Sequence, residues 1–573
     1  MMKFHFSGGT AGHGSHAPAG AGSQARLHRR RRALRNAVCR IERLEGRTLL
    51  SAAPISQNVT TYHNDLARTG QDLNETILTP ANVNQNSFGK LFTDTVDGQV
   101  YTQPLYMASL AMPDGKTHNV VYVATEHDSV YAFDADAAGA PLWKDSFINP
   151  AAGVTTVAST DVGTGDISPE IGITGSPVID PASNTLYVLA KTKEVTNGVT
   201  SYVQRLHALN LFTGAEKFGG PVAISAAVPG TGAGSVNGMV HFDPFRNNQR
   251  SALALVNGAV YICWAAHGDN GTYHGWVIGY NATTLQQSFA YCASPNGSEA
   301  GMWMSGGAPA ADASGNLYIS VGNGTADASD FGESLLKLNP NATNPADFFT
   351  AFNAAALNSN DRDFGSGAVL LVPSQGAGQP NEIVTGGKEG RLYLLNRDNL
   401  GHVNTGVVVN GQTVDSSAIA EFTDVGKDFD NAAYFNGKVY VAPVMDYLRS
   451  YALANGTMTL SQSGPFTAAF PGGQISISAN GTNNAVLWEL EFGTHSVLRA
   501  FNPANIDQEY YDSNQAGARD QLDSGVKFAV PTVANGHVYA GTADSLTVFG
   551  LAPAGQAAPA APSGLSAVAA GPN

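Results

Sequence analysis

The residues of this sequence that can do acid–base or metal chemistry lie in short polar loops between apolar stretches. Glu, His and Asp follow one another over 126–128, and His267, Asp269 and His274 share the glycine-rich loop "AAHGDNGTYHGW". A histidine or carboxylate so placed can act as a general base, and two histidines with an aspartate can bind a transition metal. The spacing matches no strong metal motif, so catalytic residues and metal ligands stay unassigned.

Other loops of the same kind carry further charged side chains. If these loops meet at one mouth of a channel, they form a ring of mixed charge on rigid strands, which suits a binding site. The candidate residues of this channel mouth are Glu126, His127, Asp128, Asp166, Glu170, Lys191, His267, Asp269, His274, Lys388, Glu389 and Asp446.

Several of these residues also have a purely structural interpretation. Asp128 stands in a tight turn, where aspartate is common. Lys388 can pair with its neighbour Glu389. Three adjacent side chains in one tight turn rarely converge, so we do not expect a catalytic triad at 126–128.

The tryptophans and cysteines leave alternatives open. Trp264, Trp276 and Trp303 can pack between strands or form a platform for a sugar, and packing is the favoured interpretation. Cys263 and Cys292 can pair if the fold brings them together, or stay buried and free. Three cysteines in all are too few for a disulfide scaffold.

The elements that position these loops form a repeat. The stretch "VYVATEHDSVYAFDADAAGAPLW" (Val121–Trp143) has seven further copies, which begin about 60 residues apart. Each copy is a strand, a polar loop, a second strand ending near Asp or Asn, and a Gly or Asn turn. Most are preceded by a short strand of small and apolar residues, such as "GITGSPVID". This pattern predicts an all-β fold, an eight-bladed β-propeller of four-stranded antiparallel blades.

The ends of the repeat indicate how the ring closes. The last copy ends at "LTVFGL" without an outer strand, while "FGKLFTDTVDG" (Phe88–Gly98) is a lone strand ahead of the first blade. We expect that strand to complete the eighth blade, which removes an exposed edge. Two smaller domains are the alternative organisation. The predicted divisions are a disordered basic export or signal-like segment (1–58), the propeller (59–551), and a Pro/Ala linker with the start of a fibronectin type III-like strand (552–573).

With its "VYAFDA" strand and final "LW", Val121–Trp143 resembles the pyrroloquinoline-quinone (PQQ) repeat. The chain over about 59–551 is similar to bacterial PQQ-like propeller proteins, related to quinoprotein alcohol dehydrogenases. Matching pieces include "LARTGQDLNETILTPANV", "HGDNGTYHGWVIGY" and "GGKEGRLYLLNRDNLG". The resemblance is specific for fold and weaker for activity, because one fold hosts many functions.

As cofactor, the resemblance implies PQQ with Ca²⁺ in the channel. In the dehydrogenases of that group, a disulfide between adjacent cysteines covers one face of the quinone and a Trp the other. A carboxylate and an Asn help to hold Ca²⁺, and an Asp is the general base. This sequence has no Cys-Cys pair and no matching motif for the Ca²⁺ ligands or the base, so no cofactor position carries over.

The distribution of charge along the sequence limits the kinds of partner that this protein can bind. Residues 1–50 hold ten of the 31 Lys and Arg and two of the 46 Asp and Glu, which leaves a net charge of +8 there and −23 in the rest. An acidic body argues against nucleic acid or anionic lipid as partner. No run of about 18 apolar residues predicts a transmembrane helix. We expect a monomeric propeller whose partner is a protein, a glycan or a cell-surface component.

The N-terminal segment predicts the compartment. "RIERLEGRTLLSAAP" resembles the "LEPR-LLS" element of large planctomycete surface proteins, with Gly46 where that pattern has Pro. The resemblance implies export to the cell surface, the extracellular space or the periplasm. A basic tail that binds an acidic partner is the alternative.

Functions of different classes follow from these observations. The favoured one is a non-catalytic binding or scaffold propeller. The alternative is a quinoprotein oxidoreductase, a PQQ-dependent dehydrogenase of alcohols or sugars. A carbohydrate-binding or carbohydrate-active propeller is a weaker alternative, and hydrolysis would need paired carboxylates about 5–10 Å apart.

Overall fold

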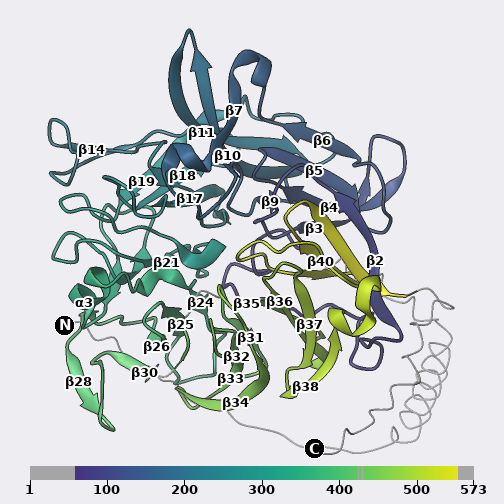
Figure 1. Cartoon of the computed structure of the whole chain (residues 1–573). Helices are drawn as coiled ribbons and strands as arrows, with labels where there is room; N and C mark the ends of the chain where they lie inside the picture. Colours follow the sequence, from purple (N-terminus) through teal and green to yellow (C-terminus); the bar gives the residue numbers. More distant parts are fainter. Residues whose placement is uncertain (1–57, 424, 428–430, 553–573) are drawn as a thin grey trace, which may run out of the picture. The chain divides into compact units, whose positions relative to one another are not determined.

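Alternating apolar residues between turns produce strands through most of the chain (Figure 1). The computed structural model describes residues 58–423, 425–427 and 431–552. The predicted export segment and the C-terminal linker with its fibronectin-like strand lie outside these residues. The described helices are short, with α2 at Ser159–Val162 and α3 at Ala354–Ser359. None of them is long and apolar enough to cross a membrane.

Eight four-stranded antiparallel sheets follow one another, which confirms the predicted eight-bladed propeller. The first blade is β3 (Leu105–Ala111), β4 (Thr117–Ala124), β5 (Ser129–Asp134) and β6 (Trp143–Ser146). The second is β9 (Val178–Asp180), β10 (Thr185–Thr196), β11 (Val199–Asn210) and β12 (Val222–Ala223). The third is β16 (Ala254–Val256), β17 (Ala259–Ala266), β18 (Trp276–Asn281) and β19 (Gln287–Cys292). The fourth is β20 (Ala310–Ala311), β21 (Leu317–Val321), β22 (Ser334–Leu338) and β23 (Asp347–Thr350).

The other four blades repeat this order from the innermost strand outward. The fifth is β24 (Leu370–Leu371), β25 (Glu382–Gly387), β26 (Arg391–Asn396) and β30 (Ala418–Phe422). The sixth is β31 (Ala433–Phe435), β32 (Lys438–Val441), β33 (Tyr447–Ala454) and β34 (Thr457–Thr467). The seventh is β35 (Gly473–Asn480), β36 (Asn483–Glu491), β37 (Val497–Asn502) and β38 (Asn505–Asp512). The eighth is β39 (Thr532–Ala534), β40 (His537–Gly541), β41 (Ser545–Leu551) and β2 (Phe88–Thr95).

Insertions add strands to these blades. The second blade gains β7 (Val154–Ala158) and β8 (Glu170–Ile171), and the third gains β15 (Asn247–Asn248). The hairpins β13 (Ala227–Pro229) with β14 (Met239–His241), and β28 (Gly406–Val409) with β29 (Gln412–Asp415), form separate two-stranded sheets. The remaining strands are β1 (Gln71–Asp72), which pairs parallel with β35, and β27 (His402–Val403), which pairs parallel with β23.

Apolar side chains from facing blades fill the space between them. Trp264 and Trp276 pack inside one such core, as the packing interpretation predicts. Cys263 and Cys292 are both buried and free, and they belong to the cores on the two sides of the third blade. They therefore do not form the disulfide that the sequence left open.

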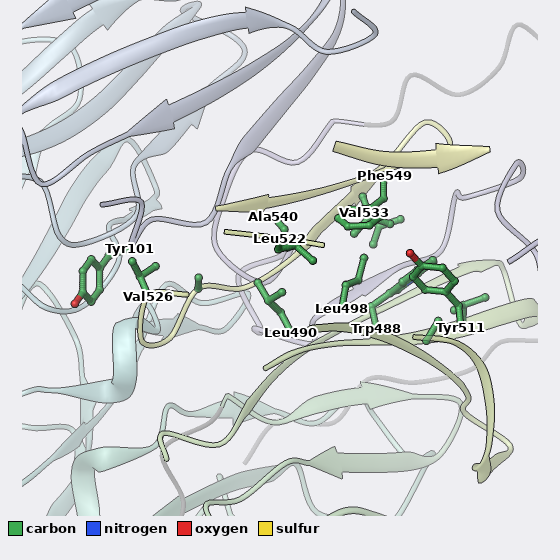
Figure 2. Packing of buried hydrophobic residues seen from close by; sticks show 14 of the residues in the cluster. Tyr101, Trp488, Leu490, Leu498, Tyr511, Leu522, Val526, Val533, Ala540 and Phe549 are labelled. Carbon is green, nitrogen blue, oxygen red and sulfur yellow. The ribbon is translucent and has the colours of Figure 1, made fainter. Parts of the chain in front are cut away.

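The strand β2 joins the start of the described chain to its end. It pairs antiparallel with β41 from Phe88 opposite Leu551 to Thr95 opposite Ser545. Phe88 is fully buried, with its ring centroid 5.3 Å from that of Trp488 and 4.9 Å from that of Tyr511. Figure 2 shows Trp488 and Tyr511 of the seventh blade in one core with Val533 and Phe549 of the eighth.

A segment ahead of β2, residues 58–75, crosses the inner strands of the blades, and we call it the strap. Its backbone carbonyls accept hydrogen bonds from inner strands of five blades, at Ile179, Ala311, Leu371, Tyr434 and Ile477. In the first blade Val59 bridges Tyr106, and in the eighth Glu75 accepts from the Gly536 N–H. The strap thus links seven blades, and none of the sequence patterns predicts it.

Arg68 holds the strap in its conformation. The side chain is buried, and Nε and Nη2 both donate to the Pro309 carbonyl at 3.0 and 2.8 Å. Nη1 donates to Thr61 Oγ1 and to the carbonyls of Tyr62 and Asp65, at 2.8–3.0 Å. Burial lowers the pKa of the guanidinium to about 10, so it stays charged at neutral pH. One cation therefore ties together both the strap and the connection into the fourth blade.

We expect Phe88→Ala to lower the free energy of unfolding by about 3–5 kcal/mol, because it leaves a cavity where β2 closes the ring. Urea denaturation measures this change. Phe492→Ala removes a ring that is 40% exposed and should cost about 1 kcal/mol or less. Similar small losses in both variants would contradict a closing role for β2.

Arg68→Ala should cost roughly 3 kcal/mol or more, because buried carbonyls lose charged donors. Arg362→Ala, at an exposed arginine, should stay within about 0.5 kcal/mol of the parent protein. Chemical denaturation of both variants provides the comparison. If the Arg68 variant is as stable as the Arg362 variant, the strap does not depend on the guanidinium.

Candidate binding site at the channel mouth

A cavity of about 410 Å³ lies where the connections between blades meet. Each of the seven connections from the first blade to the eighth contributes to its lining, as do loops between the second and third strands of two blades. Its charged lining includes Asp166, Arg250, Asp269, Asp361, Asp363 and Lys388. A binding site assembled from so many blades is rigid, because each connection is anchored by a strand on both sides.

The strap is connected to the wall of this cavity. The lining residues of the connections precede the inner strands, whereas the strap bonds to the inner strands themselves. Tyr62 of the strap packs against Ala252, Ala308 and Val530 in a small core of its own. The Asn431 amide donates to the Tyr62 hydroxyl and, at 3.3 Å, to the carbonyl of Ser305, which lines the cavity. The strap is therefore connected to the cavity wall through Asn431, although none of its own residues lines the cavity.

Arg250 is a cation of the cavity whose terminal nitrogens lack hydrogen-bond acceptors within the described part of the chain. It is only 3% exposed, and its Nη1 and Nη2 have no hydrogen-bond partner among the described residues. Its guanidinium carbon lies 5.1 Å from the Tyr101 ring centroid and 4.7 Å from that of Phe528. Cation–π contacts with two rings hold the guanidinium in place without neutralising its charge.

Most of the carboxylates at the cavity are engaged by lysines. Lys388 Nζ lies 2.7 Å from Asp361 and 2.6 Å from Asp363, and Lys527 Nζ lies 2.5 Å from Asp166. Burial, opposed by the attraction of two aspartates, leaves the pKa of Lys388 above its usual range. These lysines therefore serve first as counter-ions to the protein's own carboxylates.

Asp269 differs from the other carboxylates because it has a phenol as partner. It accepts a hydrogen bond from the Tyr273 hydroxyl, and its backbone has a φ of +55°. Burial raises the pKa of Asp269 to about 6. The side chain can therefore take up a proton close to neutral pH.

Aromatic side chains form the rest of the wall. Trp303, Phe470 and Phe528 line the cavity together with the charged groups. Trp303 thus lies at the channel mouth, unlike the two tryptophans buried within a blade core. The mixture of rings and charges suits an organic molecule with one polar end.

Of the twelve residues that the sequence analysis selected, Asp166, Asp269 and Lys388 line this cavity. The adjacent residues 126–128 point to different partners. Glu126 is buried and accepts from the Gly172 N–H at 2.8 Å and from Thr174 Oγ1 at 3.1 Å. His127 Nδ1 lies 2.9 Å from Glu170 Oε1. Asp128 takes a φ of +52° and is buried, which agrees with its interpretation as a turn residue.

Lys191 and His267 meet, but inside the protein rather than at the cavity. Lys191 Nζ lies 2.6 Å from His267 Nε2 and donates at 3.0 Å to the carbonyls of Phe245 and Asn247. Burial lowers the pKa of Lys191 to about 7, and burial with the nearby cations lowers the pKa of His267. Both side chains are at most 4% exposed, so this pair stabilises blade contacts instead of meeting a ligand.

The last three predicted residues are also structural. His274 is buried between the Ser294 and Ala233 carbonyls, at 2.9 and 2.8 Å. Asp446 pairs with Arg449 at 2.8 Å. The Glu389 carboxylate pairs with Arg391 at 2.8 Å, so the predicted Lys388–Glu389 pair is wrong. Lys388 finds two aspartates on the preceding connection, which neutralise it better than one neighbour can.

Sequence reasoning missed Arg250 and the aspartates at 361 and 363. It searched mainly the loops between second and third strands, whereas most of the lining comes from connections between blades. A signal was available, because "NNQRSALALVNGAVY" places an arginine directly before a small-residue inner strand. The same position in every blade leads into the channel mouth.

Comparison with known proteins supports the fold alone. No protein-family model and no curated protein matches the chain. Among solved structures, the quinohemoprotein alcohol dehydrogenase from Comamonas testosteroni is 14% identical, with a TM-score of 0.55 over 87% of this chain and 81% of that one. The quinohemoprotein alcohol dehydrogenase ADHIIG from Pseudomonas putida HK5 is 13% identical, with a TM-score of 0.59 over 86% and 80%. A europium-containing methanol dehydrogenase is 13% identical, with a TM-score of 0.54 over 86% and 98%. The chain thus has the propeller fold of the quinoprotein dehydrogenases.

The residues at the cavity do not fit a quinone paired with Ca²⁺. Ca²⁺ takes six to eight oxygen ligands, usually with several carboxylates among them. Within the described residues, no three His, Cys, Asp or Glu side chains are grouped closely enough to hold a metal ion. Three of the carboxylates at the cavity are instead paired with lysines. No reaction step through the quinone follows from this arrangement.

Glu126→Gln should remove part of the protein's loss of stability with rising pH. Burial raises the pKa of Glu126 to about 7 in the folded protein, while its ordinary value is 4.5. The contribution of Glu126 to the free energy of unfolding is therefore fully present below pH 4.5 and is lost as the pH rises through 7. The free energy of unfolding of the variant, compared with that of the parent protein, should rise by on the order of 2 kcal/mol between pH 4.5 and pH 8. Urea denaturation at both pH values measures the gain, and a difference that stays constant would contradict it.

Proposed function

We propose that this protein is an exported, non-catalytic binding propeller whose ligand occupies the channel mouth. The observation that supports this most directly is the cavity of about 410 Å³, lined from all seven connections between blades. Such a cavity accepts a small molecule or the end group of a larger glycan or peptide.

The arrangement of charges favours binding over chemistry. Asp166, Asp361 and Asp363 each pair with a lysine, so these carboxylates already have counter-ions within the protein. No paired free carboxylates are present among the described lining residues, so glycoside hydrolysis has little support. A protein, a glycan or another cell-surface component remains the proposed natural partner.

Export is the second part of the proposal, and it rests on the planctomycete-type element around Gly46. Residues 1–58 fused to a reporter should carry it out of the cytoplasm of a planctomycete host. Cell fractionation detects the reporter, and the same fusion with Leu49 and Leu50 changed to Asp provides the control. Equal retention of both fusions in the cytoplasm would contradict export.

A quinoprotein oxidoreductase is the second candidate, and Asp269 favours it. This carboxyl lines the cavity with a pKa near 6, which suits a general base, and Trp303 offers a ring to a planar cofactor. Full-length protein is therefore titrated with PQQ and Ca²⁺ and assayed for dye reduction with alcohols and aldoses. A bound quinone spectrum with turnover would overturn the non-catalytic proposal.

Ligand binding at the cavity should quench the fluorescence of Trp303. Of the five tryptophans, Trp303 lines the cavity, while Trp143 lies at the first blade's outer strand. A panel of mono- and disaccharides, organic acids and short peptides is titrated into the full chain. At least one class should quench the parent protein and Trp143→Phe but not Trp303→Phe. Quenching that survives in Trp303→Phe would place the ligand elsewhere, and no quenching by any class would contradict the proposed site.

A further inference from the structure

We propose that the ligand of the channel mouth carries a carboxylate on an aromatic or apolar body, and that Arg250 recognises this carboxylate. This inference rests on the proposed function, because it names the chemistry of the molecule that the cavity binds. The observations behind it are the terminal nitrogens of Arg250, which have no hydrogen-bond acceptor among the described residues, and the aromatic and acidic side chains around that residue.

The first argument is the cost of leaving Arg250 unpaired. Burying a charged donor without an acceptor is expensive, so buried arginines almost always have partners. Arg68 has acceptors for all three of its nitrogens, and Arg499 pairs with three carboxylates at 2.6–2.8 Å. Arg250 is as buried as Arg68, yet its two terminal amino groups have no acceptor within the described part of the chain. An acceptor supplied by a ligand would remove this cost.

Secondly, two aromatic rings hold the guanidinium of Arg250 in one orientation. Tyr101 and Phe528 contact the guanidinium through cation–π interactions, and both rings are themselves buried. These rings restrict the guanidinium, while Nη1 and Nη2, in a residue that lines the cavity, are buried without an acceptor among the described residues. Two parallel N–H donors match the two oxygens of a carboxylate, and a pre-oriented arginine loses little entropy on binding it.

The third argument separates a monoanion from a more highly charged one. Asp166 and Asp269 line the same cavity, and the attraction between Arg250 and Asp166 lowers the pKa of that aspartate against the effect of burial. A dianion such as phosphate carries more negative charge than the Arg250 guanidinium balances, and it would meet repulsion from Asp269, which has no cationic partner among the described residues. A single carboxylate balances Arg250, and Trp303 and Phe470 can pack against an apolar body.

Calorimetric titration of the full chain with benzoate, benzamide and inorganic phosphate tests the inference. Benzoate and benzamide have nearly the same shape and differ in charge. We expect benzoate to bind at least tenfold more tightly than benzamide, and phosphate to bind no better than benzamide. Arg250→Gln should weaken benzoate binding at least tenfold, and Arg250→Lys should recover part of it.

Arg246→Gln is the matched control. Arg246 lies four residues away on the same connection and also stacks on a phenylalanine, with its guanidinium carbon 4.9 Å from the Phe245 ring centroid, but it does not line the cavity. Its substitution should leave benzoate affinity unchanged within a factor of two. Thermal melting confirms that each variant is folded, and the comparison of benzoate with benzamide on the parent protein holds even if Arg250→Gln does not fold.

The outcomes separate this inference from the proposed function. Equal binding of benzoate and benzamide, or unchanged benzoate affinity in folded Arg250→Gln, would overturn the carboxylate assignment. So would phosphate binding more tightly than benzoate. If neutral sugars quench Trp303 while no carboxylate binds, the inference fails and the binding function stands. If no ligand of any class reaches the cavity, both fail.

Discussion

The hydrogen bonds of Arg68 are the constraint on which the rest of the structure depends. The guanidinium fixes the strap against the connection into the fourth blade, and the strap then bonds to inner strands around the channel. The strap therefore links the inner strands of several blades, and the connections that precede those strands line the channel-mouth cavity.

The polar character of the cavity follows from the connections between blades that line it. The polar groups of the connections gather around one space at the channel mouth. Most of them satisfy one another, as in the ion pairs of Lys388 and Lys527. Arg250 has no hydrogen-bond acceptor for its two terminal nitrogens among the described residues, and a buried donor in this state calls for a partner from outside the chain. The likeness in fold to quinoprotein dehydrogenases does not identify the ligand. A cluster of carboxylates that could bind Ca²⁺ is not found among the described residues.

The sequence predicts the blades well because their signal is local. Alternation over four to eight residues and a repeat of about 60 residues define strands such as β4 and β5, and they indicate the number of blades. The place of β2 follows from the same counting, since the last blade lacks an outer strand. The strap has no such periodicity, and its contacts join residues hundreds of positions apart, as between Arg68 and Pro309.

The candidate site was harder to predict for the same reason. Asp166, Asp269 and Lys388 were found because loops of known position carry them. Lys191 on β10 and His267 directly after β17 come from corresponding places in their blades, yet they turn toward each other and are buried. Whether a side chain faces the channel or a blade interface depends on packing between blades, which a single repeat does not encode. Arg250 stands out only once its missing partners are counted in three dimensions.

The most direct test of this account is a crystal structure of the full chain with 4-bromobenzoate, in which the anomalous signal of bromine locates the ligand. The account predicts one bromine peak in the channel-mouth cavity, near Trp303 or Phe470, with both carboxylate oxygens within hydrogen-bond distance of Arg250. A carboxylate that points away from Arg250, or a cavity without bromine at saturating ligand, would contradict it.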